Sequence, residues 1–461
     1  MKIHVFGAAK VVTGSCYLVE TEKSKILVDC GLFQGPKEIT KLNYEPFRFN
    51  PKEVSDVILT HAHLDHSGLL PKLVRYGFSG KIWSTAATRD LTEVILRDTV
   101  HIQYDDLRDI NRVRAQKGLP PLKELYFTED VDKTIDSFKI IPYDEMIKIT
   151  EDISIRLRDA GHILGSAIIE MFVTEKDKST KIVFSGDLGQ WNVPIINDPT
   201  LIDSADYVFI ESTYGNRLHE DVALREELLL DAVTTTFERN GKLLIPSFAI
   251  ERTQELLYYF HRFLNQNKFP PEEVFVDSPL AIKATDVFKK HRECYDSDAV
   301  SEFKSVFSFP NLKLLVRKSQ SKRVNNYEEP AIIIAGSGMC TGGRIVHHLR
   351  HQLWKKENML LFVGYQADGT LGREILDGAK EVEILNEKVK VNAEVRKIES
   401  FSAHADSREL VRWLEGFKQK PKKVFIVHGE EDAINEFKRQ LTNFGFNCYV
   451  PSLNETVELK E

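Results

Sequence analysis

The chain is poor in cysteine, and its cysteines follow no pairing pattern. Five are present among 461 residues, at scattered positions and without CxxC spacing. Secreted disulfide scaffolds need a dense, even set of cysteines, and cysteine-based zinc sites need CxxC pairs. We therefore exclude both classes and expect free thiols in a reducing compartment. The cysteines are Cys16, Cys30, Cys294, Cys340 and Cys448.

Long apolar runs are also absent. Runs such as residues 331–335 and 359–363 fall far below the ~20 residues that a membrane helix requires. Residues 1–7 lack the apolar core of a secretory signal and alternate like a first strand. We expect a cytoplasmic protein with no membrane partner.

The sequence has no excess of positive charge. The net charge of −7 and the pI near 6.1 argue against a protein that coats nucleic acid through bulk charge, although a local basic groove is compatible with them. The apolar fraction of 42% and the charged fraction of 28% are those of an ordinary globular protein. A length of 461 residues favours two domains.

Hydrophobic patterning divides the chain into three parts. The first part has mainly short strand-like runs that end in polar or glycine-rich turns, with one amphipathic helix predicted within residues 88–117. From about residue 220, helical patterns alternate with apolar strands, which favours a parallel α/β domain. After residue 397 the pattern of short strand-like runs that end in polar turns returns. The sequence thus predicts that residues 211–396 are inserted between residues 1–210 and 397–461.

The strongest motif is His61-Ala62-His63-Leu64-Asp65-His66. Neutral imidazole and carboxylate are the ligands that zinc accepts, and a catalytic pair of ions needs about seven or eight of them. Three imidazoles and a carboxylate would be a poor choice for an unliganded loop. We expect the preceding apolar strand to position the loop and Ser67-Gly68 to lead into a helix near Leu69.

Two further potential ligands each follow a predicted strand. His162 comes after the run at residues 153–158, and Asp187 comes after the run at residues 181–184. Open α/β sheets place ligand-binding residues in loops beyond strand ends. Taken alone, each of these two residues is equally well explained as an ordinary polar-loop residue.

In this order the motifs resemble those of the metallo-β-lactamase fold, an αββα sandwich with metals at one edge. They further resemble the β-CASP nucleases, which insert an α/β cap domain before the last ligand. An acidic residue after a strand and two histidines beyond the insertion complete that pattern. Glu211, His404 and His428 match it, in Glu211-Ser212-Thr213, Ser402-Ala403-His404 and Val427-His428-Gly429.

This resemblance implies a set of roles. His61, His63 and His162 would hold one zinc; Asp65, His66 and His428 would hold a second; and Asp187 would bridge the two Zn²⁺ ions of each chain. Asp29 would orient a ligand without binding metal. His404 would be the general acid, held charged by Glu211. Asp65 counts among the catalytic residues as well as the ligands.

The resemblance further implies a ribonuclease in RNA processing or decay that acts on single-stranded RNA. Two zinc ions lower the pKa of a shared water, so the products would carry 5′-phosphate and 3′-hydroxyl ends. RNA is preferred over DNA because RNA-processing members have a histidine at the last motif, as His428 is here. We expect an endonuclease, although the sequence does not exclude 5′-to-3′ exonuclease action, and a homodimer is an alternative that the sequence leaves open.

A glycine-rich turn in the predicted cap is the candidate substrate contact. Its residues Ser337, Gly338, Met339 and Arg344 lie between a buried strand and a predicted helix, where backbone N–H groups can approach a phosphate. A purely structural turn explains the pattern equally well, but similar segments line the substrate channel of β-CASP nucleases.

Three other functions compete with this reading. A small-molecule hydrolase on the same fold would need no large cap, and a DNA-directed β-CASP nuclease would share the metal site. An RNA-binding scaffold with a defunct site would be expected to have lost several of the ligands. Cleavage of matched RNA and DNA strands, together with metal analysis, separates these alternatives.

Overall fold

The computed structural model describes residues 1–176, 178–268, 272–367 and 369–459. Two compact units make up the chain. The sandwich unit comprises Met1–Trp191, Asp198–Leu218 and His404–Glu461, and the inserted unit comprises Asn192–Asn197 and His219–Ala403. The chain therefore leaves the first unit and returns to it, as an inserted domain requires.

The first sheet of the sandwich unit has the strand order β22-β1-β2-β3-β4-β5-β6. Strands β3, β4, β5 and β6 run parallel to one another, so their carboxyl ends lie along one edge. The strands are β1 (Lys2–Val5), β2 (Tyr17–Glu20), β3 (Lys25–Val28), β4 (Asp56–Ile58), β5 (Lys81–Ser84), β6 (Phe138–Ile140) and β22 (Glu455–Glu458).

The second sheet has the order β21-β20-β11-β10-β9-β8-β7. Strands β10, β11, β20 and β21 run parallel, and this arrangement again gathers carboxyl ends at one edge. The strands are β7 (Met146–Lys148), β8 (Ile153–Asp159), β9 (Ala167–Glu175), β10 (Lys178–Phe184), β11 (Tyr207–Ile210), β20 (Lys423–Ile426) and β21 (Cys448–Tyr449).

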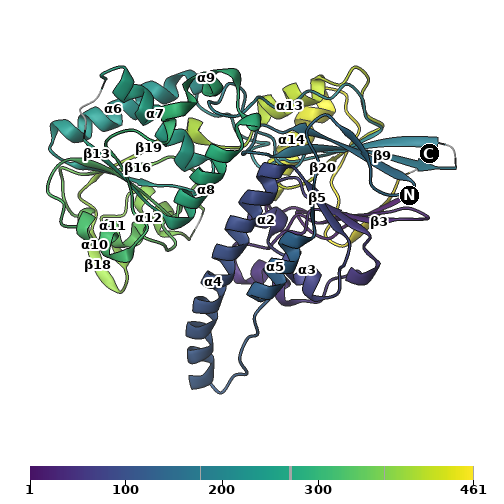
Figure 1. Cartoon of the computed structure of the whole chain (residues 1–461), viewed down its shortest axis with the longest axis horizontal. Helices are drawn as coiled ribbons and strands as arrows, with labels where there is room; N and C mark the ends of the chain where they lie inside the picture. Colours follow the sequence, from purple (N-terminus) through teal and green to yellow (C-terminus); the bar gives the residue numbers. More distant parts are fainter. Residues whose placement is uncertain (177, 269–271, 368, 460–461) are drawn as a thin grey trace. The chain divides into compact units, whose positions relative to one another are not determined.

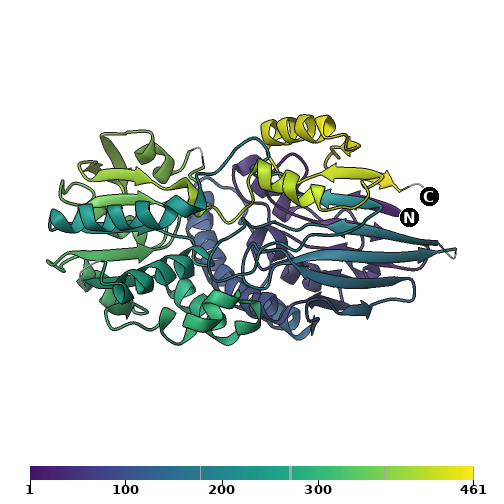
Figure 2. The same cartoon turned by 90° about the horizontal axis from the view of Figure 1, so that it is seen from above.

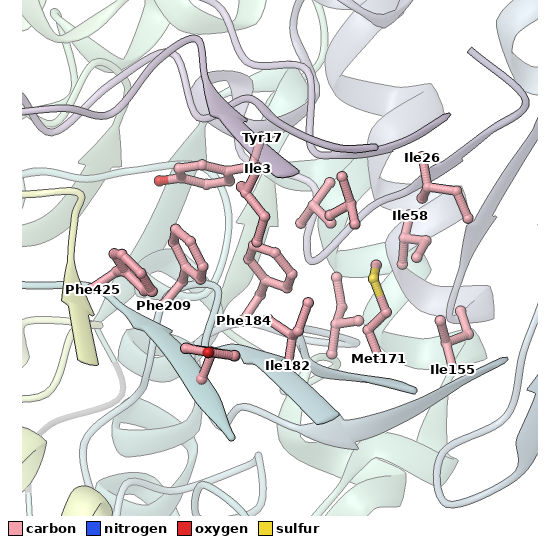
Figure 3. Close-up of a cluster of buried hydrophobic side chains, with 14 of the residues drawn as sticks. Ile3, Tyr17, Ile26, Ile58, Ile155, Met171, Ile182, Phe184, Phe209 and Phe425 are labelled. Atoms are coloured by element: carbon pink, nitrogen blue, oxygen red, sulfur yellow. The ribbon is translucent and has the colours of Figure 1, made fainter. Parts of the chain in front are cut away.

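An apolar core joins the two sheets, and Figure 3 shows part of it. Ile3, Tyr17 and Ile58 reach into it from the first sheet, and Phe209 and Phe425 reach into it from the second. The aromatic rings of Phe209 and Phe425 stack with centroids 4.4 Å apart. Alternate residues of β11 and β20 point to the other face of the sheet, so both faces of these strands are buried and their sequences are continuously apolar.

Helices cover the outer face of each sheet. A cluster that includes Leu73, Leu96 and Val131 packs α3 (Leu70–Arg75), α4 (Ala86–Gln116) and α5 (Thr128–Asp136) on the first sheet. A second cluster, with Trp413 and Phe437, packs α13 (Ser407–Glu415) and α14 (Glu431–Asn443) on the second sheet. This layering confirms the predicted αββα sandwich, and α4 confirms the helix predicted within residues 88–117.

The inserted unit contains a sheet of order β14-β13-β15-β12-β16-β19, paired in parallel throughout. Figure 2 shows its strands lying side by side between helices. The predicted α/β alternation is therefore confirmed. The strands are β12 (Lys242–Pro246), β13 (Glu273–Asp277), β14 (Leu312–Leu314), β15 (Ala331–Ala335), β16 (Met359–Phe362) and β19 (Glu394–Lys397), and β17 (Glu381–Ile384) with β18 (Glu387–Lys390) forms a separate hairpin.

The helices of the inserted unit precede or connect these strands. They are α6 (Arg225–Glu238), α7 (Arg252–Asn265), α8 (Pro279–Lys290), α9 (Ser297–Val306), α10 (Lys318–Val324), α11 (Ile345–Gln352) and α12 (Leu371–Leu376). Within the described ranges, no helix combines the length and the apolar character needed to cross a membrane. No disulfide joins any two cysteines in the described part of the chain.

Candidate metal centre

The histidine cluster begins where β4 ends, at the sheet edge that gathers carboxyl ends. The second half of the cluster departs from the predicted open loop, because Leu64–Ser67 forms the single-turn helix α2. The amide groups of His66 and Ser67 donate to the carbonyl of His63. Asp65 and His66 are therefore fixed by a helical turn, and the helix α3 starts only at Leu70.

A first group of ligand atoms gathers His61, His63, His162 and Asp187 within 4.8 Å of one another. The Nε2 atoms of His61 and His162 lie 3.2 and 3.1 Å from Nδ1 of His63. Oδ2 of Asp187 lies 3.5 and 3.7 Å from the same Nε2 atoms of His61 and His162. Residues from three loops thus converge on one point.

A second group contains Asp65, His66 and His428. Nε2 of His428 lies 3.3 Å from Nε2 of His66 and 3.4 Å from Oδ2 of Asp65. The other oxygen of Asp187, Oδ1, lies 3.3 Å from Nε2 of His66 and 3.6 Å from Nδ1 of His428. Each oxygen of Asp187 therefore faces a different group.

Buried hydrogen bonds orient the histidine rings. Oδ2 of Asp29 lies 2.7 Å from Nδ1 of His66, and it also accepts a hydrogen bond from the Thr60 hydroxyl at 2.9 Å. Because that hydroxyl proton is given to Asp29, the Thr60 oxygen accepts from Nδ1 of His61, 3.1 Å away. Both rings therefore carry their proton on Nδ1 and offer the lone pair of Nε2 to the site.

The arrangement fits metal ions. Two ligand atoms on one tetrahedral zinc lie about 3.3 Å apart, close to the separations found within each group. Oδ1 of Asp187 is buried and accepts no hydrogen bond from any described residue, although a buried carboxylate oxygen ordinarily has a partner. A cation between the groups would satisfy that oxygen and replace contacts between facing nitrogen atoms.

The protonation preferences of the cluster follow from burial and charge. Burial lowers the pKa of His63 to about 4, so this ring is neutral. Burial raises the pKa of Asp65, but its hydrogen bond with His428 and the charge of His66 outweigh burial and lower this pKa to about 2. Burial also lowers the pKa of His66, yet the charges of Asp187 and Asp29 raise it well above the usual value. The carboxylates therefore attract positive charge to this side of the site.

Glu211 and His404 form a pair next to the two groups. Nδ1 of His404 lies 3.1 Å from Oε1 of Glu211 and 3.9 Å from Oδ2 of Asp187. Burial lowers the pKa of His404, but the charge and hydrogen bond of Glu211 outweigh this and raise it to about 9. The ring is partly exposed, whereas the Glu211 side chain is fully buried, so a proton held on His404 is accessible.

The predicted substrate residues lie in the inserted unit, in the turn between β15 and α11. Gly338 is buried, and Ser337 and Met339 are partly exposed. The Arg344 guanidinium donates to Asp277 at 2.5 Å and to the carbonyls of Leu315 and Val316. The structure therefore engages the Arg344 side chain with its own unit.

Sequence reasoning did not identify several hydroxyl groups that hold the ligands. Thr60 contacts Asp29 and His61, and the Thr213 hydroxyl lies 3.2 Å from Nδ1 of His428. The Ser166 hydroxyl accepts a hydrogen bond from the His162 amide at 3.1 Å. The only signal in the sequence was their position: Thr60 and Ser166 lie one and four residues from a ligand, and Thr213 lies two residues from Glu211.

Fold and site together define a class, the metal-dependent hydrolases built on the metallo-β-lactamase sandwich. Residues 9–213 match the metallo-β-lactamase superfamily. Residues 253–375 match the β-CASP domain, and residues 388–451 match a domain described as the RNA specificity domain of Zn-dependent metallo-hydrolases. The chain belongs to the β-CASP family of this superfamily, which confirms the resemblance.

Relatives align over almost the whole chain. Ribonuclease TTHA0252 of Thermus thermophilus is 37% identical, over 94% of each chain. An RNase J-like protein of Methanocaldococcus jannaschii is 34% identical over 93% of this chain and 92% of its own length, and the transcription termination factor FttA of the same organism is 31% identical over 100% and 72%. A solved structure of a protein of unknown function from Enterococcus faecalis covers 99% of both chains with a TM-score of 0.57 and 14% identity, a likeness of fold alone.

Proposed function

We propose that this protein is a zinc-dependent ribonuclease that hydrolyses phosphodiester bonds of single-stranded RNA, as an endonuclease in RNA processing or decay. The observation that carries the proposal is the position of Asp187, whose two oxygens face two separate groups of ligand atoms. A shared carboxylate of this kind suits a two-metal hydrolase. The RNA specificity match at residues 388–451 supports the choice of substrate, as do relatives named as ribonucleases.

In this proposal the sandwich unit holds two zinc ions. His61, His63 and His162 would hold one, Asp65, His66 and His428 would hold the other, and Asp187 would be shared by both; the distances within each group support this division. When bound, the zinc pair supplies hydroxide near neutral pH and positive charge opposite the reacting phosphorus. Asp29 keeps the lone pair of His66 directed at the site through its hydrogen bond to Nδ1.

His404 acts as the general acid for the leaving 3′-oxygen. With its pKa raised to about 9, the ring carries a proton at neutral pH, as a general acid must. Glu211 orients the ring and stabilises its charge. The Leu188 amide donates to Oε1 of Glu211 at 2.8 Å. This hydrogen bond fixes the Glu211 carboxylate and, through it, the orientation of the His404 ring.

We assign substrate contact to the backbone of the turn that contains Ser337, Gly338 and Met339, and we assign Arg344 to holding that turn through Asp277. In domain terms, we assign the sequence-predicted residues 1–210 and 397–461 to the metallo-β-lactamase domain and residues 211–396 to the β-CASP cap. The compact units instead divide at Leu218 and His404, which leaves Glu211 in the sandwich unit. The cytoplasmic location and the homodimer considered from the sequence stay predictions.

Cleavage of matched 5′-labelled RNA and DNA strands by the purified protein tests the proposal. We expect internal cuts in RNA, 5′-phosphate and 3′-hydroxyl ends, and little DNA cleavage. His404→Ala should lower the rate by about 10²–10⁴-fold, whereas His101→Ala, at an exposed histidine on α4, should leave it unchanged. A 2′,3′-cyclic phosphate on the upstream fragment would refute attack by water, and DNA cleavage equal to RNA cleavage would refute the substrate assignment.

A further inference from the structure

The distal half of α4 stands away from the layers of the sandwich unit, as Figure 1 shows. The helix has 31 residues and is about 46 Å long. Its first half is anchored by buried residues up to Val100, but Leu107 alone is buried after that point. We call residues 101–127, which comprise this half and the segment that returns to the body, the arm.

The arm is fastened to itself, so its shape is defined. The Asn111 side chain bonds the carbonyl and the amide of Leu122, at 2.9 and 2.7 Å. The Arg114 side chain donates to the carbonyl of Pro120 at 2.7 Å. These bonds hold the returning segment along one side of the helix. Residues 102, 105, 109, 110, 112 and 113 of the helix are exposed.

Three apolar side chains are exposed on the rest of the helix surface, among charged ones. Ile102, Ile110 and Val113 are 53%, 44% and 50% exposed. At 100° per residue, the three fall within an arc of about 80° on the helix, and the exposed Asp106 lies within the same arc. They therefore form an apolar stripe that carries one carboxylate. Leu119, which is 47% exposed, lies at the tip of the arm, and Tyr44, which is 46% exposed, lies near Asp106 at its base. A single exposed apolar residue needs no explanation, but a stripe on a projecting helix does.

Charge along the arm is arranged in two halves of opposite sign. Residues 101–110 contain Asp105, Asp106 and Asp109 with one basic residue, Arg108, whose guanidinium lies 3.3 Å from Asp105. Residues 111–120 contain Arg112, Arg114 and Lys117 and no acidic residue. The acidic half would repel a phosphate backbone. An arrangement of this kind complements itself when two copies lie antiparallel.

We propose that the arm is a self-association surface that pairs antiparallel with the arm of a second copy of this chain. A two-fold axis next to Ile110 brings Asp109 of each copy to the level of Arg112 in the other, twice by symmetry. The same register places Ile102 level with Leu119 of the second copy. An apolar residue at the base of one arm therefore lies beside an apolar residue at the tip of the other. The interface is small, which makes the dimer a weak one, with dissociation in the micromolar range.

Sedimentation velocity on the full chain at about 1–100 µM tests the proposal, with RNA cleavage and thermal unfolding as controls for folding. We expect a concentration-dependent dimer in the wild type. Ile110→Asp should give a monomer, because the substitution places a charge at the axis. Arg112→Glu should raise the dissociation constant about tenfold or more, since it faces Asp109 twice.

The double variant Asp109→Arg with Arg112→Asp is the matched control. It exchanges the two charges within one chain and leaves the antiparallel pairing complementary, so it should dimerise as the wild type does. All these positions are exposed, and the variants should melt and cleave RNA as the wild type does. A wild-type monomer at about 100 µM, a dimer insensitive to Ile110→Asp, or failure of the charge exchange to restore pairing would each overturn the proposal. RNA binding that is weakened by Arg112→Glu in a monomeric protein would assign the arm to RNA and would overturn it too.

Discussion

Replacement of Asp29 by asparagine tests how far the protein tunes its metal site from beyond the ligands. Asp29 has a left-handed backbone with φ of 59°, which asparagine tolerates better than most residues, so the substitution preserves the turn. The carboxylate accepts from Nδ1 of His66 at 2.7 Å, from the Thr60 amide at 2.8 Å and from the Thr60 hydroxyl at 2.9 Å. All three partners are donors, and an asparagine NH₂ group must face at least one of them.

We expect this mismatch to lower the metal affinity of the site. If the NH₂ group faces His66, the ring loses the acceptor that directs its Nε2 lone pair to the site. If the NH₂ group faces Thr60, the buried amide that precedes His61 loses its acceptor. Loss of such an outer contact costs about 10- to 100-fold in metal affinity, or about 1.4–2.8 kcal/mol.

Zinc affinity measured against a competing chromophoric chelator, with metal content per chain, gives the answer for Asp29→Asn. Asp152→Asn is the matched control, because Asp152 is also buried and accepts from Ser24 and Thr21, each at 2.5 Å, but belongs to neither ligand group. We expect Asp152→Asn to lower stability without changing zinc affinity. Unchanged zinc affinity in Asp29→Asn would refute the reasoning.

Four further predictions concern the site and its support. Removal of metal by a chelator should abolish RNA cleavage, and added zinc should restore it; full activity of a metal-free preparation would contradict the two-metal proposal. Because His404 must be protonated and its pKa is raised by Glu211, activity should fall as pH rises through that pKa, and Glu211→Gln should move this alkaline limb to lower pH in a pH–rate profile. Gly31→Ala should lower metal content, since an added Cβ would lie 1.7 Å from the Asp65 carbonyl oxygen; an unchanged metal content would show that the loop can shift. Phe209→Ala, in the core of Figure 3, should lower the free energy of unfolding by about 3–5 kcal/mol in a denaturant titration, and a loss under 1 kcal/mol would mean that the core refills the space.

Local sequence patterns predicted much of the fold. Strands such as β11 and β20 are buried on both faces, so their continuous apolar runs stand out. The helix α4 was found because its first half keeps an apolar face. By contrast, α2 is a single turn whose residues include metal-ligand candidates. Those residues were selected for the site, so the sequence shows no helical pattern there. The projection of the arm was also hidden, because spacing in the sequence does not show where a body ends.

The sequence by itself determined that the protein carries the side chains of a metal site. Residue type and spacing alone indicate a metal site at His61, His63, Asp65 and His66, because few other roles suit so many imidazoles in one loop. Tertiary structure decided the rest. Glu211 and His404 are separated by 192 residues in the chain, and only the folding of both onto one edge of the second sheet brings them to 3.1 Å. Packing likewise directs the two oxygens of Asp187 to different groups, since orientation comes from buried neighbours and no spacing in the chain encodes it.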